Sequence, residues 1–183
     1  MVFTVDEFRS QLSGDGARPN LFQVQFTLPP FLGVNGAAQR MSFMCNTAQL
    51  PGSTLGTVQS YYFGREVKLA GNRTYPQWTV QVINDEDFTV RNAMERWHFA
   101  INSPVGNLRS PNAPQVDGGY GTDATVLQFG KQGDVIKSYT FIGLFPIDIS
   151  PIELNWGAND QIEEFALTFD YQYWVSDDPQ SQT

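Results

Sequence analysis

The feature that most constrains the fold is a strict alternation of apolar and polar side chains near the carboxyl end of the chain. Within Ile162–Val175, every odd-numbered position from Phe165 to Tyr173 is aromatic or aliphatic, and the positions between them are mostly polar. Only an extended strand places alternate residues on opposite faces. The segment is therefore predicted to be a β-strand with one continuous apolar face, which must pack against a second layer.

Similar segments recur along the chain and predict a structure made mainly of strands. Apolar and polar residues alternate from Leu21 to Leu28 and again from Trp78 to Val82. The polar positions, which must face away from the core, are Gln23, Gln25, Thr79 and Gln81. Further strands, rich in β-branched and aromatic residues, are predicted at Met41–Asn46, Ala124–Gly130 and Val135–Phe145.

A long β-hairpin is predicted in the middle of this series. Its strands, Thr54–Phe63 and Arg65–Leu69, flank Gly64, and Ala70–Thr74 closes it. Tyr61, Tyr62 and Phe63 form an aromatic group near its tip or along one strand. Such a group would promote aggregation if it stayed exposed in a monomer. We therefore expect it to be buried against another subunit.

One segment has the periodicity of a helix packed on a sheet. Val90, Met94, Trp97 and Ile101 repeat at three- and four-residue spacing. The acidic run Asn84–Asp87 before them suits a helix N-terminus through capping and the helix dipole.

A second, short helix is predicted at Val5–Leu12. Thr4 and Glu7 have the spacing of a capping box, and Phe3 and Phe8 that of a hydrophobic staple.

These elements predict a single domain, residues 1–175, that is mainly β: a sandwich or barrel with one packed helix and a long hairpin. Residues 29–39 and 102–123 are predicted to be loops, and residues 176–183 a loose polar tail. Several strands would leave unpaired edges in a monomer. Either these edges are protected, or they are the means of assembly.

The charge balance argues against a protein that clamps nucleic acid. Eleven Lys and Arg residues stand against nineteen Asp and Glu, a formal net charge of -8. Sequence-independent DNA affinity depends on cations that displace phosphate counterions. DNA can therefore pass such a protein without adhering to it. No apolar run has the length of a membrane span, and the N-terminus lacks the pattern of a secretory signal.

Few residues offer material for catalysis or metal binding. His98 is the only histidine and Cys45 the only cysteine, which leaves little for a catalytic triad, a multi-histidine metal site or a disulfide. We interpret His98 as a structural or surface residue and Cys45 as a small buried hydrophobe.

Three acidic pairs could in principle serve a glycosidase or bind a cation. Asp85 and Asp87 are better explained by a helix start, Glu163 and Glu164 by a strand start, and Asp177 and Asp178 by a solvated tail. Gly118–Gly121 lacks the Lys-Ser or Lys-Thr of a phosphate loop and is interpreted as a contact loop. Asn72–Thr74 matches a glycosylation sequon but, without a secretory signal, has no route to the modifying enzyme. We predict no enzyme activity, no cofactor and no metal.

Several short motifs resemble one family and occur in its order. They are Ser13–Val24, Phe43–Cys45, Ala48–Gly52, Ala70–Thr74, Trp78–Val80, Asn84–Glu86, Gly143–Pro146, Leu154–Trp156 and Ile162–Trp174. Together they resemble the tail tube proteins of contractile-tailed bacteriophages, which are related to the tube proteins of type VI secretion and of extracellular contractile injection systems. Residues 29–39 and 102–123 depart from the family pattern, which leaves their contacts undefined.

The resemblance implies a subunit of hexameric rings, in which strands of six subunits join into one continuous inner β-barrel. Stacked rings would form a conduit for DNA ejection into the host. The implied partners are other copies, a tail sheath protein, a baseplate tube initiator, a tail terminator and a tape measure protein, with DNA passing unbound and no insertion into a membrane. The implied location is the virion, after assembly in the host cytoplasm.

Two groups of residues are candidates for these roles. The inter-subunit contacts are assigned to Tyr61, Tyr62, Phe63, Arg65 and Arg73. The lumen is predicted to be polar and predominantly acidic, so that its wall repels phosphate. Its neutral lining is assigned to Gln23, Gln25, Thr79 and Gln81, with acids interspersed from other strands.

Two alternatives remain open from the sequence. The chain could be the tube protein of an extracellular contractile injection system or of type VI secretion, with protein as cargo. It could also be a monomeric carbohydrate-binding β-sandwich that uses aromatic residues as a sugar platform.

Overall fold

The computed structural model describes residues 5–12, 16–33, 36–111 and 119–177. Its centre is an antiparallel sheet of seven strands in the order β1-β6-β7-β8-β5-β2, with β9 paired to β7. This sheet folds over itself into a sandwich, which confirms the prediction of a mainly β protein. The strands are β1 (Phe22–Phe26), β2 (Cys45–Ala48), β5 (Trp78–Ile83), β6 (Thr122–Phe129), β7 (Val135–Ile149), β8 (Glu164–Asp170) and β9 (Tyr173–Ser176).

The two layers of the sandwich share the long strand β7. Its first half pairs with β6 and β9, and its second half pairs with β8. The bend lies at Gly143, whose φ of 67° suits glycine, and where an added Cβ would come within 3.0 Å of the Gln172 side chain. The strand predicted at Ile162–Val175 therefore exists as β8 and β9, which bend together with β7 where they pass from one layer to the other.

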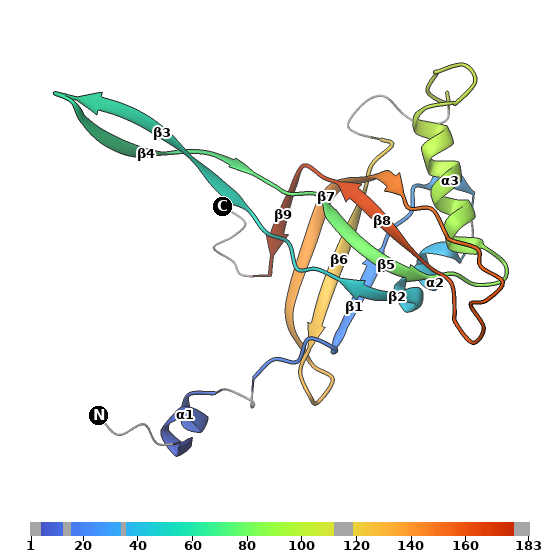
Figure 1. Ribbon diagram of the computed structural model, residues 1–183, viewed down its shortest axis with the longest axis horizontal. Helices are drawn as coiled ribbons and strands as arrows, with labels where there is room; N and C mark the ends of the chain where they lie inside the picture. The colour runs from blue at the N-terminus through green and yellow to red at the C-terminus, as the bar shows by residue number, and fades with distance from the viewer. Residues whose placement is uncertain (1–4, 13–15, 34–35, 112–118, 178–183) are drawn as a thin grey trace.

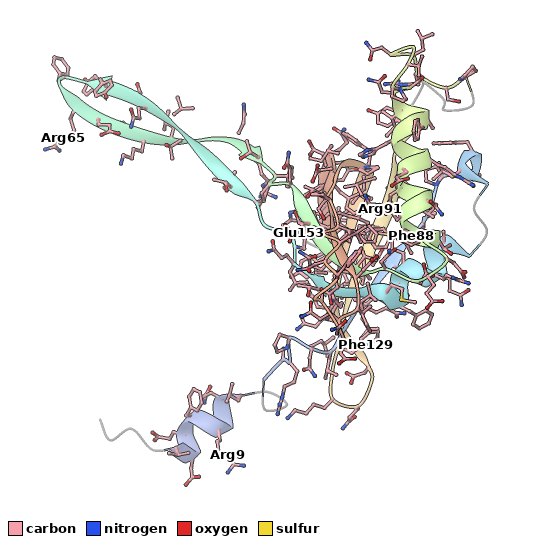
Figure 2. All side chains as sticks on the ribbon, turned by 45° about the vertical axis from the view of Figure 1, so that its right-hand side comes forward. Arg9, Arg65, Phe88, Arg91, Phe129 and Glu153 are labelled. Atoms are coloured by element: carbon pink, nitrogen blue, oxygen red, sulfur yellow. The ribbon has the colours of Figure 1, made fainter. Side chains whose placement is uncertain are left out.

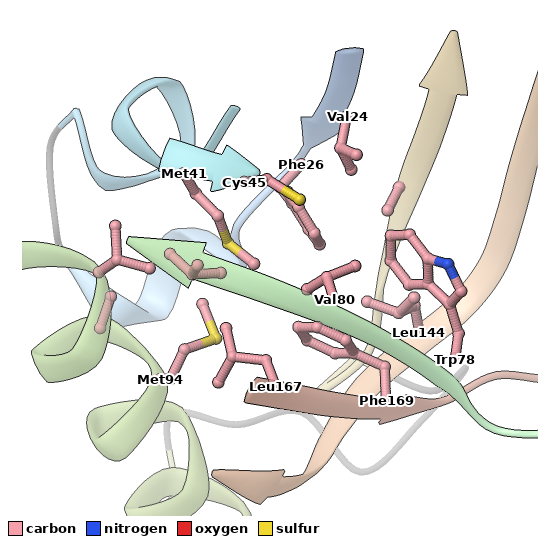
Figure 3. Packing of buried hydrophobic residues seen from close by; sticks show 14 of the residues in the cluster. Val24, Phe26, Met41, Cys45, Trp78, Val80, Met94, Leu144, Leu167 and Phe169 are labelled. Carbon is pink, nitrogen blue, oxygen red and sulfur yellow. The ribbon is translucent and has the colours of Figure 1, made fainter. Parts of the chain in front are cut away.

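Between the two layers lies a core of alternate residues from each strand. Trp78 stacks on Phe141 with ring centroids 4.3 Å apart, and its Nε1 donates to the carbonyl oxygen of Gln49. Phe26 and Phe169 pack on the same ring system (Figure 3). The alternation seen in the sequence thus directs one face of β1, β5 and β8 inward, as predicted.

Two helices cover one end of the sandwich. The predicted helix is present as α3 (Thr89–Ile101), and it buries Val90, Ala93, Met94 and Trp97. The second, α2 (Ala37–Met44), occupies most of a segment that was predicted to be a strand, so the strand prediction at Met41–Asn46 is wrong for residues 41–44.

Packing explains why α2 is helical. Ala37 and Met41, one helical turn apart, are both buried where α2 meets β1 and α3. Arg40 on the same helix donates from Nη1 to Asp85 at 2.7 Å and to Asp87 at 3.1 Å. These contacts come from distant parts of the chain, and they outweigh the local strand preference.

Two elements project from the sandwich. The hairpin of β3 (Thr54–Tyr62) and β4 (Arg65–Thr74) forms a separate two-stranded sheet that extends from one end of the molecule (Figure 1). The helix α1 (Val5–Gln11) confirms the prediction of a short N-terminal helix and lies away from the strands. Its predicted capping and staple residues Phe3 and Thr4 lie outside the described residues.

The predicted loops contain more structure than expected. Residues 29–39 include a 3-10 turn at Pro30–Leu32 and the start of α2, and 34–35 lie outside the described residues. Of 102–123, residues 112–118 lie outside the description, and with them Gly118 of the proposed contact loop. Of the predicted tail, Ser176 ends β9 and is buried, Asp177 pairs with Lys137 at 2.8 Å, and residues 178–183, including Asp178, are not described.

Candidate assembly interface

The hairpin turns through two residues with left-handed backbone conformation. Phe63 has a φ of 47° and Gly64 a φ of 77°, and they join Tyr62 to Arg65, which face each other across the ladder. Two successive positive φ values define the type I′ turn that matches the twist of a hairpin. The turn therefore holds the Phe63 side chain at the very tip, where it is 92% exposed.

The two faces of the hairpin differ in chemistry. Residues directly opposite each other in an antiparallel ladder share a face. One face carries the pairs Val58–Leu69, Ser60–Val67 and Tyr62–Arg65, and the other carries Gln59–Lys68 and Tyr61–Glu66. One face is therefore mainly apolar with an arginine at its tip, and the other is mainly polar.

Nothing in the described chain covers the apolar face. Val58, Tyr62 and Leu69 are each more than half exposed. The rings of Tyr62 and Phe63 contact each other edge to face, with centroids 4.6 Å apart. An exposed apolar strip of this length is typical of a protein interaction surface.

A glycine pair sets the base of the hairpin. At Gly71 an added Cβ would lie 3.0 Å from both the carbonyl carbon and the oxygen of Gly56. The ladder is irregular at this point, between Leu55 and Thr57. Because β-bulges increase twist and bend strands, this crossing fixes the direction in which the hairpin leaves the sandwich.

The structure separates the five predicted contact residues into three places. Tyr62 and Arg65 lie together on the apolar face, Phe63 is at the tip, and Tyr61 points to the polar face. Arg73 lies at the base, opposite Leu55. The sequence identified the aromatic group but could not assign its members to faces, because the position of the turn decides the register.

The four predicted lumen residues lie on two different surfaces. Gln23 and Gln25 are on the outer face of the β1-β6-β7-β9 layer, and Thr79 and Gln81 on the outer face of the β5-β8 layer. All four point away from the core, as predicted. The outer faces of a sandwich look in opposite directions, so a single wall can include only one of the two pairs.

Further exposed apolar surfaces lie on α1 and on the loop between β7 and β8. On α1, Val5 and Phe8 are 74% and 66% exposed. In the loop, Leu154 and Trp156 are 81% and 101% exposed. From the sequence, Trp156 is assigned only to a family motif. Its place between Asn155 and Gly157, outside any strand pattern, is a signal of surface exposure.

Cys45 and His98 are structural residues. Burial raises the pKa of the Cys45 thiol to about 12, so it remains protonated and unreactive near neutral pH. Burial lowers the pKa of His98, although its hydrogen bond to the Pro146 carbonyl and the charges of Asp148 and Glu95 act in the opposite direction. His98 thus holds α3 against β7 as a neutral ring.

The acidic pairs have structural roles too. Asp85 Oδ1 accepts a hydrogen bond from the Thr89 backbone N–H at 3.1 Å, which confirms its assignment to a helix start. Glu164 begins β8, as predicted. Within the described ranges there is no group of three or more His, Cys, Asp or Glu suited to a metal ion, and none of the helices described there has the length and apolarity to span a membrane.

These features define a structural protein that acts through contacts with other protein subunits: a filled β-sandwich from which an amphipathic hairpin projects uncovered. The family model for phage tail tube proteins matches residues 17–177. The tail tube protein gp19 of Enterobacteria phage T4 is 32% identical over 174 residues, which cover 94% of this chain and 99% of that protein. The chain belongs to the phage tail tube protein family, and it is a structural component of virions, not an enzyme.

Solved structures share the fold. A chain in the cap of the anti-feeding prophage superposes with a TM-score of 0.64 at 18% identity, covering 96% of this chain and 98% of that one. A chain in the sheath-tube complex of the extracellular contractile injection system PVC superposes with a TM-score of 0.56 at 12% identity, with the same coverage. The comparisons do not support a carbohydrate-binding sandwich.

Proposed function

We propose that this protein forms hexameric rings that stack into the inner tube of a contractile phage tail, through which DNA leaves the capsid. The observation that carries the proposal is the match to the phage T4 tail tube protein over 94% of the chain. The tube is part of the virion and assembles in the host cytoplasm.

Free strand edges support ring formation. In the described residues β1 and β2 end the strand path, and β9 pairs only with β7, so each has one edge without a strand partner. A closed ring of subunits would satisfy these hydrogen-bonding groups, as closure does in any β-barrel. The uncovered hairpin would then contact the neighbouring ring through Tyr62, Phe63 and Arg65, with Tyr61 and Arg73 at the margins.

Sedimentation and electron microscopy test this proposal. We expect the purified protein to form rings, and tubes at high micromolar concentration or when a baseplate initiator is added. A monomer under both conditions, with no rings or tubes in micrographs, would contradict it.

The lumen is expected to be polar and without a cationic lining. The outer face with Gln23 and Gln25 also carries Thr125 and Thr140, and the outer face with Thr79 and Gln81 carries Asp148 and Glu164. On both outer faces, the residues paired across the strands include no Lys or Arg. Either face would therefore release no counterions from DNA and would let it pass without binding. A structure of the tube with Lys and Arg lining the lumen would overturn this mechanism.

The partners proposed for the tube are a tail sheath protein, a baseplate initiator, a tail terminator and a tape measure protein. Solved structures with this fold include a baseplate, a sheath-tube complex and a sheath/tube terminator. An injection-system tube is the second candidate, supported by the same fold. The gene neighbourhood separates the two: capsid, portal and terminase genes indicate a phage, and an ATPase with toxin genes indicates an injection system.

A further inference from the structure

The hairpin is basic within an acidic chain. Residues 54–74 carry Arg65, Lys68 and Arg73 against a single acid, Glu66, a net charge of +2 where the whole chain has -8. Lys68 lies 3.9 Å from Glu66, and neither Arg65 nor Arg73 has an ion pair among the described residues. The surface that receives this hairpin should therefore offer both apolar area and carboxylates.

The loop between β7 and β8 combines both properties without any Lys or Arg. The segment from Ser150 to Glu164, named here the acidic loop, consists of the connection between β7 and β8 and the first residue of β8. It carries four carboxylates and no Lys or Arg, a net charge of -4. Its Leu154, Trp156 and Ile162 side chains are 81%, 101% and 72% exposed. The same loop lines an open hollow of about 440 Å³. The hollow offers apolar side chains to the aromatic tip and carboxylates to Arg65 beside that tip.

The hairpin cannot reach the acidic loop of its own chain. The hairpin tip and the acidic loop lie at opposite ends of the long axis of the molecule (Figure 1), and Figure 2 shows Arg65 at the tip, far from Glu153 on the body. Contact between opposite ends of identical subunits is heterologous, and it generates rings or filaments. A hairpin that contacts the acidic loop must therefore come from a second copy of the chain.

Charge distinguishes the acidic loop from two other exposed apolar surfaces, one on α1 and one after α3. The α1 surface, with Val5 and Phe8, carries Asp6, Glu7 and Arg9, a net charge of -1. The segment after α3 exposes Val105 and Leu108 but carries Arg109 and no acid over residues 102–111. Like charges placed together at an interface are costly, so the second of these surfaces would repel the hairpin.

We propose that the acidic loop of one copy is the receptor for the hairpin tip of the next copy, with Phe63 against Trp156 and Leu154, and with Arg65 facing the carboxylates. This inference rests on the proposed stacking function and names the surface that stacking uses.

Disulfide crosslinking tests the contact. The double variant Phe63→Cys/Trp156→Cys, allowed to assemble and oxidised with copper phenanthroline in air, should give a ladder of covalent oligomers on a denaturing gel. A bond between these positions can form only between copies, and Cys45 is buried and does not compete. The matched controls are Phe63→Cys/Val105→Cys and Phe63→Cys/Phe8→Cys, which place the second thiol on the rival surfaces. Phe63→Cys/Leu154→Cys provides a second position in the acidic loop.

The outcomes separate this inference from the proposed function. A ladder from either acidic-loop variant, weak or absent in the controls and reduced about threefold in 1 M salt, supports the contact. Tubes that form normally while only a control crosslinks, or while none does, overturn it and leave the tube function standing. Failure of the wild-type protein to assemble under any condition overturns both.

Discussion

The sandwich and the hairpin are built from the same kind of strand and differ in what covers them. Strand β5 alternates buried and half-buried residues from end to end, whereas every residue of β3 is exposed. Both have one apolar face. In the sandwich another strand layer covers that face, and in the hairpin nothing within the described chain does. Alternation therefore specifies a strand with two unlike faces, and it leaves open whether the partner of the apolar face is the same chain or another one.

The largest expected effect separates the regions by stability. Phe169→Ala removes a fully buried ring that contacts Trp78 and Phe26, and it should lower the free energy of unfolding by about 3–5 kcal/mol. Phe63→Ala removes a ring that is 92% exposed and should change it by less than about 0.5 kcal/mol. Urea unfolding of the two variants, measured below the assembly concentration, checks the contrast. Equal losses would mean that the hairpin is packed on the sandwich.

The next effect concerns the junction of the two regions. Gly71→Ala places a Cβ 3.0 Å from the Gly56 backbone, so one strand must shift, at an expected cost of about 1–3 kcal/mol. Because the shift redirects the hairpin, we expect Gly71→Ala to reduce assembly more strongly than it reduces the free energy of unfolding. Gly52→Ala is the matched control, since its Cβ would meet only Pro76 Cγ at 3.8 Å. Sedimentation showing equal assembly of both variants would argue against a fixed hairpin direction.

The aromatic tip should affect assembly and leave the fold intact. Replacement of Tyr61, Tyr62 and Phe63 by Ser should raise the concentration needed for stacking by about tenfold, because interface aromatics dominate binding energy. The free energy of unfolding should change little, since the three side chains are 69%, 70% and 92% exposed. Tyr61→Ser alone, on the polar face, should have the weakest effect. If the triple variant stacks as well as wild type, the hairpin is not part of the stacking interface.

The smallest expected effect is a pH dependence that belongs to the sandwich alone. Burial lowers the pKa of His98 in the folded protein below its ordinary value of 6.5, so the unfolded chain binds the proton first as the pH falls. The contribution of His98 to the free energy of unfolding should therefore be fully present above pH 6.5 and should decrease as the pH falls below 6.5. His98→Gln should flatten the unfolding free energy between pH 7 and pH 5. An unchanged slope would mean that His98 does not titrate differently on folding.

Much of the fold followed from local pattern, and the failures have physical causes. Phe22–Phe26, Trp78–Ile83 and α3 were predictable because their periodicity extends over a whole element. The helix α2 was missed because Ala37 and Met41 are held in place by β1 and α3, which are distant in sequence. The acidic loop carried a signal in Trp156 but no periodicity, and its position opposite the hairpin is a property of the folded chain.

The sequence by itself determined the strands at Phe22–Phe26 and Trp78–Ile83, which of their faces is buried, a hairpin that turns at Gly64, and the shortage of material for a multi-histidine site. These depend on neighbouring residues, and therefore on periodicity and turn chemistry. Only the tertiary structure decided that α2 is helical, that Gly56 and Gly71 cross closely, and that Gln23 and Gln25 face away from Thr79 and Gln81. These depend on contacts between segments far apart in the chain, whose energies local sequence does not encode.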